Sequence, residues 1–223
     1  AGMIEPNMAT LLTYVMTDAL IDAKALNTVF HQAIDSTFNT ISVDGCMSTN
    51  DTAIILANGL AGNNPLERAQ ARLQRFRDML SDVLMELAQA VIKDGEGATK
   101  FISVTVDGAK SRSDARKAAY SIANSNLVKT AFFGEDPNWG RIIAALGSSG
   151  IPLEKEKISL AIGDLIVFSQ DTPVNISVSK LKEIYQKDRI DVRVQLGGGD
   201  KSYCVYTSDL SHDYVKINAD YST

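Results

Sequence analysis

Thr10 is the residue of this sequence whose type and surroundings point most directly to chemistry. It follows a polar segment that contains Pro6 and Asn7, and it opens the largely apolar run 11–16. A threonine hydroxyl is a weak nucleophile, but an N-terminal threonine carries its own base in its free α-amine. That amine has a reference pKa of about 7.7–8.0, so a sizeable fraction of it can accept a proton at pH 7. Residue type alone also fits an ordinary strand residue, because branched side chains suit a pleated sheet.

Glu96 is a second candidate, because it stands between Gly95 and Gly97 in the turn 93–100. Glycines let a backbone approach a ligand closely, and a carboxylate can hold an ammonium group through a charge-assisted hydrogen bond. The turn lacks the spacing of a phosphate-binding loop. A third feature is the helix start at Asp136 and Pro137, whose N-terminus could attract an anion, although capping alone explains these residues.

Other functional classes find little support in the sequence. The two histidines, His31 and His212, provide neither a histidine-rich metal site nor an obvious Ser-His-Asp triad. The cysteines, Cys46 and Cys204, show no disulfide or metal spacing, which favours a reduced, cytoplasmic setting. The net charge is −5 with no basic patch, so we expect no nucleic-acid partner. No apolar run reaches the roughly 18 residues that a membrane span needs.

The elements that must position these residues alternate between helical and strand patterns, which predicts a mixed α and β fold. Helices are predicted at 22–38, from 63–65 to about 92, at 113–124 with Ser113 as cap, from 136–137 onward, and at 178–187. Strands are predicted at 11–16, 52–57, 101–106, 127–133, 157–161, 164–168, 189–196 and 202–207. The first two strands read as buried, and the glycine-rich segment 196–200 reads as the turn of a hairpin joining the last two.

Four segments resemble one family, in the family's order. They are GMIEPNMATLL at the start, the acidic-glycine turn followed by STNDT at 44–52, DGEGATKF at 94–101, and GEDPNWGR at 134–141. The ending HDYVKINADYST is also similar. Together they resemble the ornithine acetyltransferases, also called glutamate N-acetyltransferases. The chain departs from the usual pattern at Cys46 and Met47, where polar residues are common. For the loop 43–52, a satisfied turn and a site-lining role both remain open.

The resemblance implies that the protein cleaves its own Ala9–Thr10 bond. Residues 1–9 would then be the tail of a preceding N-terminal (alpha) subunit, and residues 10–223 a C-terminal (beta) subunit that carries the nucleophile Thr10. Glu96, Asn218 and Thr223 would bind substrate beside Thr10. The implied fold is a layered arrangement of packed sheets with helices outside.

The implied activity is transfer of an acetyl group from N-acetylornithine to glutamate in arginine biosynthesis, through an acetyl ester on Thr10. No metal or organic cofactor is expected, and acetyl-CoA is a further candidate donor. The expected partner is the alpha subunit from the same precursor, in an alpha2beta2 or larger assembly. In the family that subunit supplies the oxyanion-stabilising Thr-Gly pair and a lysine for the substrate carboxylate, neither of which falls within this chain.

Two alternatives stay open on the sequence. One is a self-processing amide hydrolase or aminopeptidase with the same N-terminal threonine, in which water replaces glutamate as the acceptor. The other is an inactive, uncleaved precursor.

Overall fold

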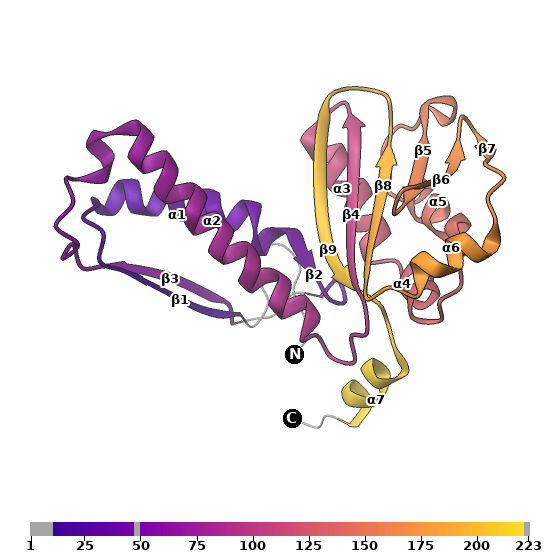
Figure 1. Ribbon diagram of the computed structural model, residues 1–223, viewed down its shortest axis with the longest axis horizontal. Coiled ribbons are helices and arrows are strands. Elements are labelled where there is room, and N and C mark those ends of the chain that lie inside the picture. The colour runs from indigo at the N-terminus through magenta and orange to yellow at the C-terminus, as the bar shows by residue number, and fades with distance from the viewer. Residues whose placement is uncertain (1–10, 47–49, 221–223) are drawn as a thin grey trace. The chain divides into compact units, whose positions relative to one another are not determined.

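The computed structural model of the chain describes residues 11–46 and 50–220 (Figure 1). Helices and strands alternate along it, which confirms the expected mixed α/β class. The chain divides into two compact units with a boundary between Val91 and Ile92. We call the residues up to Val91 the first unit and those from Ile92 the second unit. The boundary lies inside helix α2 (Gln70–Lys93), so no linker in the sequence marks it.

The first unit holds a two-stranded parallel ladder and two helices. Strands β1 (Leu12–Thr17) and β3 (Thr52–Ala57) pair in register, and helices α1 (Ala23–Ser36) and α2 lie on the same side of them in Figure 1. Shorter elements complete the unit: a 3-10 turn at Phe38–Thr40, strand β2 (Ile41–Ser42) and a 3-10 turn at Leu66–Arg68. Asp22 caps α1 by accepting from the Ala25 N–H, as its residue type favours.

One face of the β1–β3 ladder is apolar and exposed, which corrects the expectation that both strands are buried. Its exposed side chains are Leu12, Tyr14, Met16, Ile54 and Leu56. Alternation along a strand places these residues on one face, and the opposite face carries Thr13, which is 7% exposed. Parallel sheets are normally covered on both faces. The ladder therefore has the composition of a buried sheet, and the described residues cover only one side of it.

Helix α2 buries one of its two apolar rows. The buried positions are Leu80, Leu84, Ala88 and Ile92, whereas Val83 and Leu87 are 53% and 45% exposed. The helix carries apolar residues on two adjacent rows, so periodicity alone does not select the row that faces the core. It also begins at Gln70, because a separate 3-10 turn occupies 66–68.

The second unit is one sheet with helices packed against it. Its strands are β4 (Phe101–Ala109), β5 (Ser159–Ile162), β6 (Leu165–Ser169), β7 (Thr172–Pro173), β8 (Arg189–Gln195) and β9 (Lys201–Ser208). They lie in the order β9-β4-β8-β5-β6-β7, and of the neighbouring pairs only β4 and β8 are parallel. The helices are α3 (Arg112–Ala123), α4 (Asn126–Phe133), α5 (Trp139–Gly147), α6 (Val178–Tyr185) and α7 (His212–Asp220). Side chains from α3 to α6 share one core with the strands.

The predicted hairpin of the last two strands is wrong. Strand β4 lies between β8 and β9, parallel to the first and antiparallel to the second. The glycine-rich turn 196–200 therefore crosses over a strand instead of joining neighbours. The N–H groups of Gly198 and Gly199 donate to the carbonyl of Gly108 at the end of β4. A Cβ on Gly199 would lie 2.3 Å from the Ala109 carbonyl oxygen, so this crossing needs glycine.

Three local predictions in this unit are also corrected. The segment 127–133, predicted as a strand, is helix α4, because Ser125 caps it and a short apolar run does not distinguish a strand from a buried helix. Helix α3 is capped by Ser111 rather than Ser113. Helix α5 begins at Trp139 after Asn138, not at the predicted cap Asp136.

Candidate functional site

Glu96 lies in a tight turn between helix α2 and strand β4. The turn is closed by a hydrogen bond from the Ala98 N–H to the Gly95 carbonyl at 3.0 Å. Gly97 takes a left-handed conformation with φ +64°, which explains why a glycine follows the glutamate. The turn thus holds the Glu96 side chain at the end of the sheet where β4 begins.

Asn218 lies on helix α7, and the predicted tail is therefore ordered structure up to Asp220. The helix follows β9, and its first turn is satisfied by Ser211, whose Oγ accepts from the Tyr214 N–H at 3.2 Å. Asn218 Nδ2 donates to Glu96 Oε2 at 2.6 Å. Two residues that the family resemblance implies as substrate ligands, 122 positions apart, are thereby in direct contact.

Glu96 and Asn218 together present free hydrogen-bond acceptors, because both N–H hydrogens of Asn218 are already engaged. Asn218 Nδ2 also donates to the Tyr214 carbonyl at 3.0 Å, so both of its hydrogens are engaged and Oδ1 remains as an acceptor. The reverse amide orientation would point Oδ1 at two other oxygens, so the network fixes the orientation. Glu96 keeps further lone pairs beside the one that Asn218 uses. A carboxylate next to an amide oxygen suits a ligand that brings N–H donors, such as an ammonium group.

The backbone of the Glu96 turn packs closely against the start of helix α7. A Cβ on Gly97 would lie 2.6 Å from the Tyr214 nitrogen and 2.5 Å from Ser211 Oγ. The sequence suggested that Gly97 allows the backbone to approach a ligand. In the structure, Gly97 allows the turn to pack closely against helix α7. This contact is what brings Glu96 within reach of Asn218.

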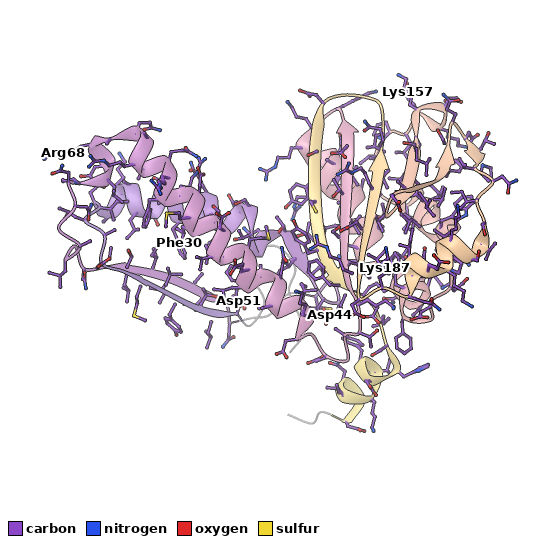
Figure 2. All side chains as sticks on the ribbon, viewed as in Figure 1. Phe30, Asp44, Asp51, Arg68, Lys157 and Lys187 are labelled. Atoms are coloured by element: carbon purple, nitrogen blue, oxygen red, sulfur yellow. The ribbon has the colours of Figure 1, made fainter. Side chains whose placement is uncertain are left out.

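The loop before β3 is tied to the residue that follows Thr10. Asp51 Oδ1 accepts from the Leu11 N–H at 2.7 Å, and the Thr52 N–H donates to the Leu11 carbonyl at 2.8 Å. Figure 2 places Asp51 at the beginning of β3. Asp51 thus holds the backbone one residue beyond Thr10, and both interpretations of the loop 43–52 stay open. Ala9, Thr10 and Thr223 themselves lie outside the described residues.

A cavity of about 400 Å³ begins directly after the Glu96 turn. Its lining includes Lys93, Thr99, Lys100, Asp188 and Arg189. Lys100 is 8% exposed, and its Nζ lies 3.1 Å from Glu135 Oε1. The lining thus carries three cationic side chains and one carboxylate, and the charge of Lys100 is already paired with Glu135.

Two ionisable side chains of strand β9 are held protonated at neutral pH. Burial raises the pKa of the Cys204 thiol above its usual value, and it raises the pKa of Tyr206 to about 12. Neither group is a thiolate or phenolate nucleophile under these conditions. Among the described residues, no three His, Cys, Asp or Glu side chains gather as metal ligands. Within the same ranges, no helix combines the length and apolar content that crossing a bilayer requires.

Sequence reasoning missed Asp209, whose carboxylate accepts three hydrogen bonds next to the Glu96 turn. It is 3% exposed, and it accepts from Thr99 and Lys100. An aspartate after a strand is a common turn residue, so no local signal distinguishes it. Its partners are about 110 residues away, which only the fold reveals.

Comparison with known proteins gives a consistent result. The ArgJ family matches this chain over residues 1–223. The arginine biosynthesis bifunctional protein ArgJ of Geobacter sulfurreducens is 52% identical over 224 residues, covering 100% of this chain and 57% of that protein. The mitochondrial ArgJ protein of Schizosaccharomyces pombe is 44% identical over 227 residues, covering 99% of this chain and 51% of that protein. The chain thus spans little more than half the length of these relatives.

A solved structure agrees with both the sequence and the fold. The crystal structure of arginine biosynthesis bifunctional protein argJ from Bacillus halodurans matches with a TM-score of 0.90 at 39% identity. The match covers 95% of this chain and 100% of that chain. At this identity the likeness extends to the family as well as to the fold.

Proposed function

The chain belongs to the ArgJ family, and from that membership we propose that it is the nucleophile-bearing part of an enzyme that transfers an acetyl group from N-acetylornithine to glutamate in arginine biosynthesis. The observation that carries the proposal is the hydrogen bond between Asn218 and Glu96. Both residues were assigned to substrate binding from the sequence, and together they offer acceptors to an ammonium-bearing substrate. N-Acetylornithine carries an ammonium group, and so do its product ornithine and the acceptor glutamate.

In the first step, the Thr10 hydroxyl attacks the carbonyl of the bound acetyl group. The free α-amine of Thr10 takes the hydroxyl proton and passes a proton to the departing amine, which leaves as ornithine. The acetyl group is then an ester on Thr10. The α-amine exists only after the Ala9–Thr10 bond is cut, so self-cleavage by the same hydroxyl must come before turnover.

In the second step, glutamate replaces ornithine and its amine attacks the ester. Thr10 leaves as the hydroxyl, and N-acetylglutamate is released. Donor and acceptor share an α-carboxylate. The α-nitrogen of N-acetylornithine carries the acetyl group, so the ammonium that it offers to Glu96 and Asn218 is the one on its side chain. Glutamate offers its α-ammonium, which must lose a proton before the amine attacks. This order of events gives ping-pong kinetics. The chemistry needs a nucleophile, a base and oxyanion donors, and so we propose that it uses no metal or organic cofactor. Acetyl-CoA is a second candidate donor.

The proposed partner is the N-terminal subunit cut from the same precursor, in an alpha2beta2 or larger assembly. The exposed apolar face of the β1–β3 ladder supports this, because parallel sheets are normally covered on both faces and a second subunit would cover this one. Met16 at 78% and Leu12 at 61% are among the most exposed of its side chains. The assembly is proposed to act in the cytoplasm.

The test is an acetyl-transfer assay on the full two-subunit protein with N-acetylornithine and glutamate. Formation of N-acetylglutamate and ornithine supports the proposal. Release of free acetate without N-acetylglutamate would instead identify a hydrolase. A parallel assay of residues 1–223 alone should show little turnover, because loss of an oxyanion donor typically costs roughly 10²–10³ in rate. Repeating the assay with acetyl-CoA as donor tests the second activity.

A further inference from the structure

The Asp209 carboxylate binds backbone N–H groups of the segment that follows Glu96. Its Oδ1 accepts from the N–H groups of Thr99 and Lys100 at 2.8 and 2.9 Å, and its Oδ2 accepts from Thr99 Oγ1 at 2.6 Å. Asp209 is 3% exposed, so the acceptor side of these charge-assisted hydrogen bonds is shielded from water, which strengthens them. Asp209 thereby fixes the chain three residues beyond Glu96.

The residues around Asp209 are themselves firmly anchored. Lys129 on α4 is 2% exposed, and its Nζ donates to Thr207 Oγ1 at 2.9 Å and to the Ser208 carbonyl. The Leu210 N–H donates to the Lys129 carbonyl at 3.4 Å. The segment 207–210 is therefore a fixed support between the sheet and α4 rather than a free connection to α7.

The same segment leads directly into the helix that carries Asn218. Ser211, two residues after Asp209, satisfies the first turn of α7 and lies against Gly97. His212, at the start of α7, makes an edge-on contact with Phe133 at 5.3 Å between ring centroids. The Glu96 turn and helix α7 thus share one support, and Asp209 is the side chain that joins the turn to it.

We propose that Asp209 is a positioning residue for substrate binding, which holds the Glu96 turn against helix α7 so that Glu96 and Asn218 present their oxygens together. It acts through Thr99 and Lys100 and does not touch the substrate. The inference rests on the proposed function for the identity of the substrate, but the coupling between the two segments stands on the described contacts alone.

The test compares Asp209→Ala with Asp209→Asn in the full two-subunit protein. The alanine variant removes all three bonds. The asparagine variant keeps an oxygen for the two backbone N–H groups, and its amide can donate to Thr99 Oγ1. Thr99→Val removes only the hydroxyl bond and guards against misfolding of the alanine variant. Asp114→Asn is the control, since Asp114 bonds Ser111 beyond the far end of β4, and a nine-residue strand spans about 30 Å.

We expect Asp209→Ala to raise KM for both N-acetylornithine and glutamate roughly 10- to 100-fold, with a smaller change in kcat and with cleavage at Ala9–Thr10 retained. Asp209→Asn should recover most of the loss, and the KM of Thr99→Val should fall between those of Asp209→Ala and wild type. Hydrogen exchange, measured without substrate, should become faster in both 97–101 and 212–219 in the alanine variant. Asp114→Asn should change none of these.

An unchanged KM in a folded Asp209→Ala enzyme would overturn the inference, as would faster exchange in 97–101 with no change in 212–219. If Asp209→Ala does not fold, an unchanged KM in Thr99→Val overturns it in the same way. If wild type transfers no acetyl group, the proposed function fails instead. The exchange data then decide separately whether Asp209 couples the two segments.

Discussion

Asn218 Nδ2 donates to Glu96 Oε2 at 2.6 Å and so joins helix α7 to the turn between α2 and β4. Both N–H hydrogens of the amide are engaged, one by the carboxylate and one by the Tyr214 carbonyl. The two side chains are therefore fixed relative to each other before any ligand arrives. Such prior arrangement lowers the cost of binding, because the binding groups need no further ordering.

Replacing Glu96 by glutamine should weaken substrate binding more than it harms self-cleavage. Asn218 can still donate to the amide oxygen, so the contact between turn and helix is kept while the charge for a substrate ammonium is lost. Loss of a charged partner is worth about 1.5–3 kcal/mol, which corresponds to a KM increase of roughly 10- to 100-fold. Steady-state kinetics would check this, with a substitution of the exposed Glu183 of α6, Glu183→Gln, as the control. An unaltered KM for both substrates would remove Glu96 from the site.

Replacing Asn218 by aspartate should set two carboxylates against each other. The repulsion raises the pKa of one of them, because two close carboxylates cannot both ionise freely. We therefore expect KM to rise about tenfold at pH 8 and to recover towards pH 6, where one proton rejoins the pair. The double variant Glu96→Gln/Asn218→Asp restores a donor facing a carboxylate and should lose this pH dependence. A pH-independent KM in the single variant would contradict the direct contact.

Replacing Gly97 by alanine should separate the Glu96 turn from α7. The new Cβ would lie 2.6 Å from the Tyr214 nitrogen at a φ of +64°. The matched control is Gly62→Ala, which has a similar φ of +69° but nothing within 4 Å of the new Cβ. Both variants should lose about 1 kcal/mol of stability from the backbone alone. Only Gly97→Ala should lose more and also raise KM, as thermal unfolding and kinetics would show. Equal behaviour of the two would mean that the close packing is unimportant.

The sequence predicted individual elements better than their arrangement. Strand 52–57 was located at its observed bounds because its β-branched run is flanked by turn residues. The segment 127–133 was misread, because seven apolar-rich residues fit either a strand or a buried helix, and the deciding Ser125 cap lies outside the run. The insertion of β4 between β8 and β9 has no local signal, since strand order is set by packing of the whole unit.

The site shows the same division between residue identity and assembly. Glu96 and Asn218 were named from short motifs, but their contact joins segments 122 residues apart. It depends on the position of α7, which is set by the strand β9 that precedes it. Asp209 and Ser211 were missed because their residue types are ordinary at a strand end and a helix start. Motifs therefore found the groups that we propose to meet the substrate, whereas the groups that hold them emerged only from the fold.

Replacing Asp51 by alanine should slow cleavage of the Ala9–Thr10 bond. The Leu11 N–H would lose its acceptor at 2.7 Å, and the backbone beside Thr10 would be less well held. A small misplacement of a reacting group can cost up to roughly 10²-fold in rate. Asp51→Asn keeps an acceptor oxygen and should cleave at nearly the wild-type rate. Time courses of precursor cleavage on gels would measure both, and equal rates for alanine and wild type would deny Asp51 this role.

The central claim is that one hydroxyl, that of Thr10, both cuts the chain and carries the acetyl group. Intact mass spectrometry of the two-subunit protein after incubation with N-acetylornithine tests it most directly. Wild type should show a piece that begins at Thr10, and the same piece with one added acetyl group when deacylation is slow enough to trap. Thr10→Ser keeps the hydroxyl and loses only the methyl that restricts χ1, so it should still cleave, more slowly, and transfer some acetyl.

In the same measurement, Thr10→Ala should remain one uncut chain with no acetyl adduct and no acetyl transfer. Cleavage of the Thr10→Ala chain at Ala9 would show that another nucleophile or an outside protease makes the cut. Acetyl transfer by that variant would contradict the account at its centre.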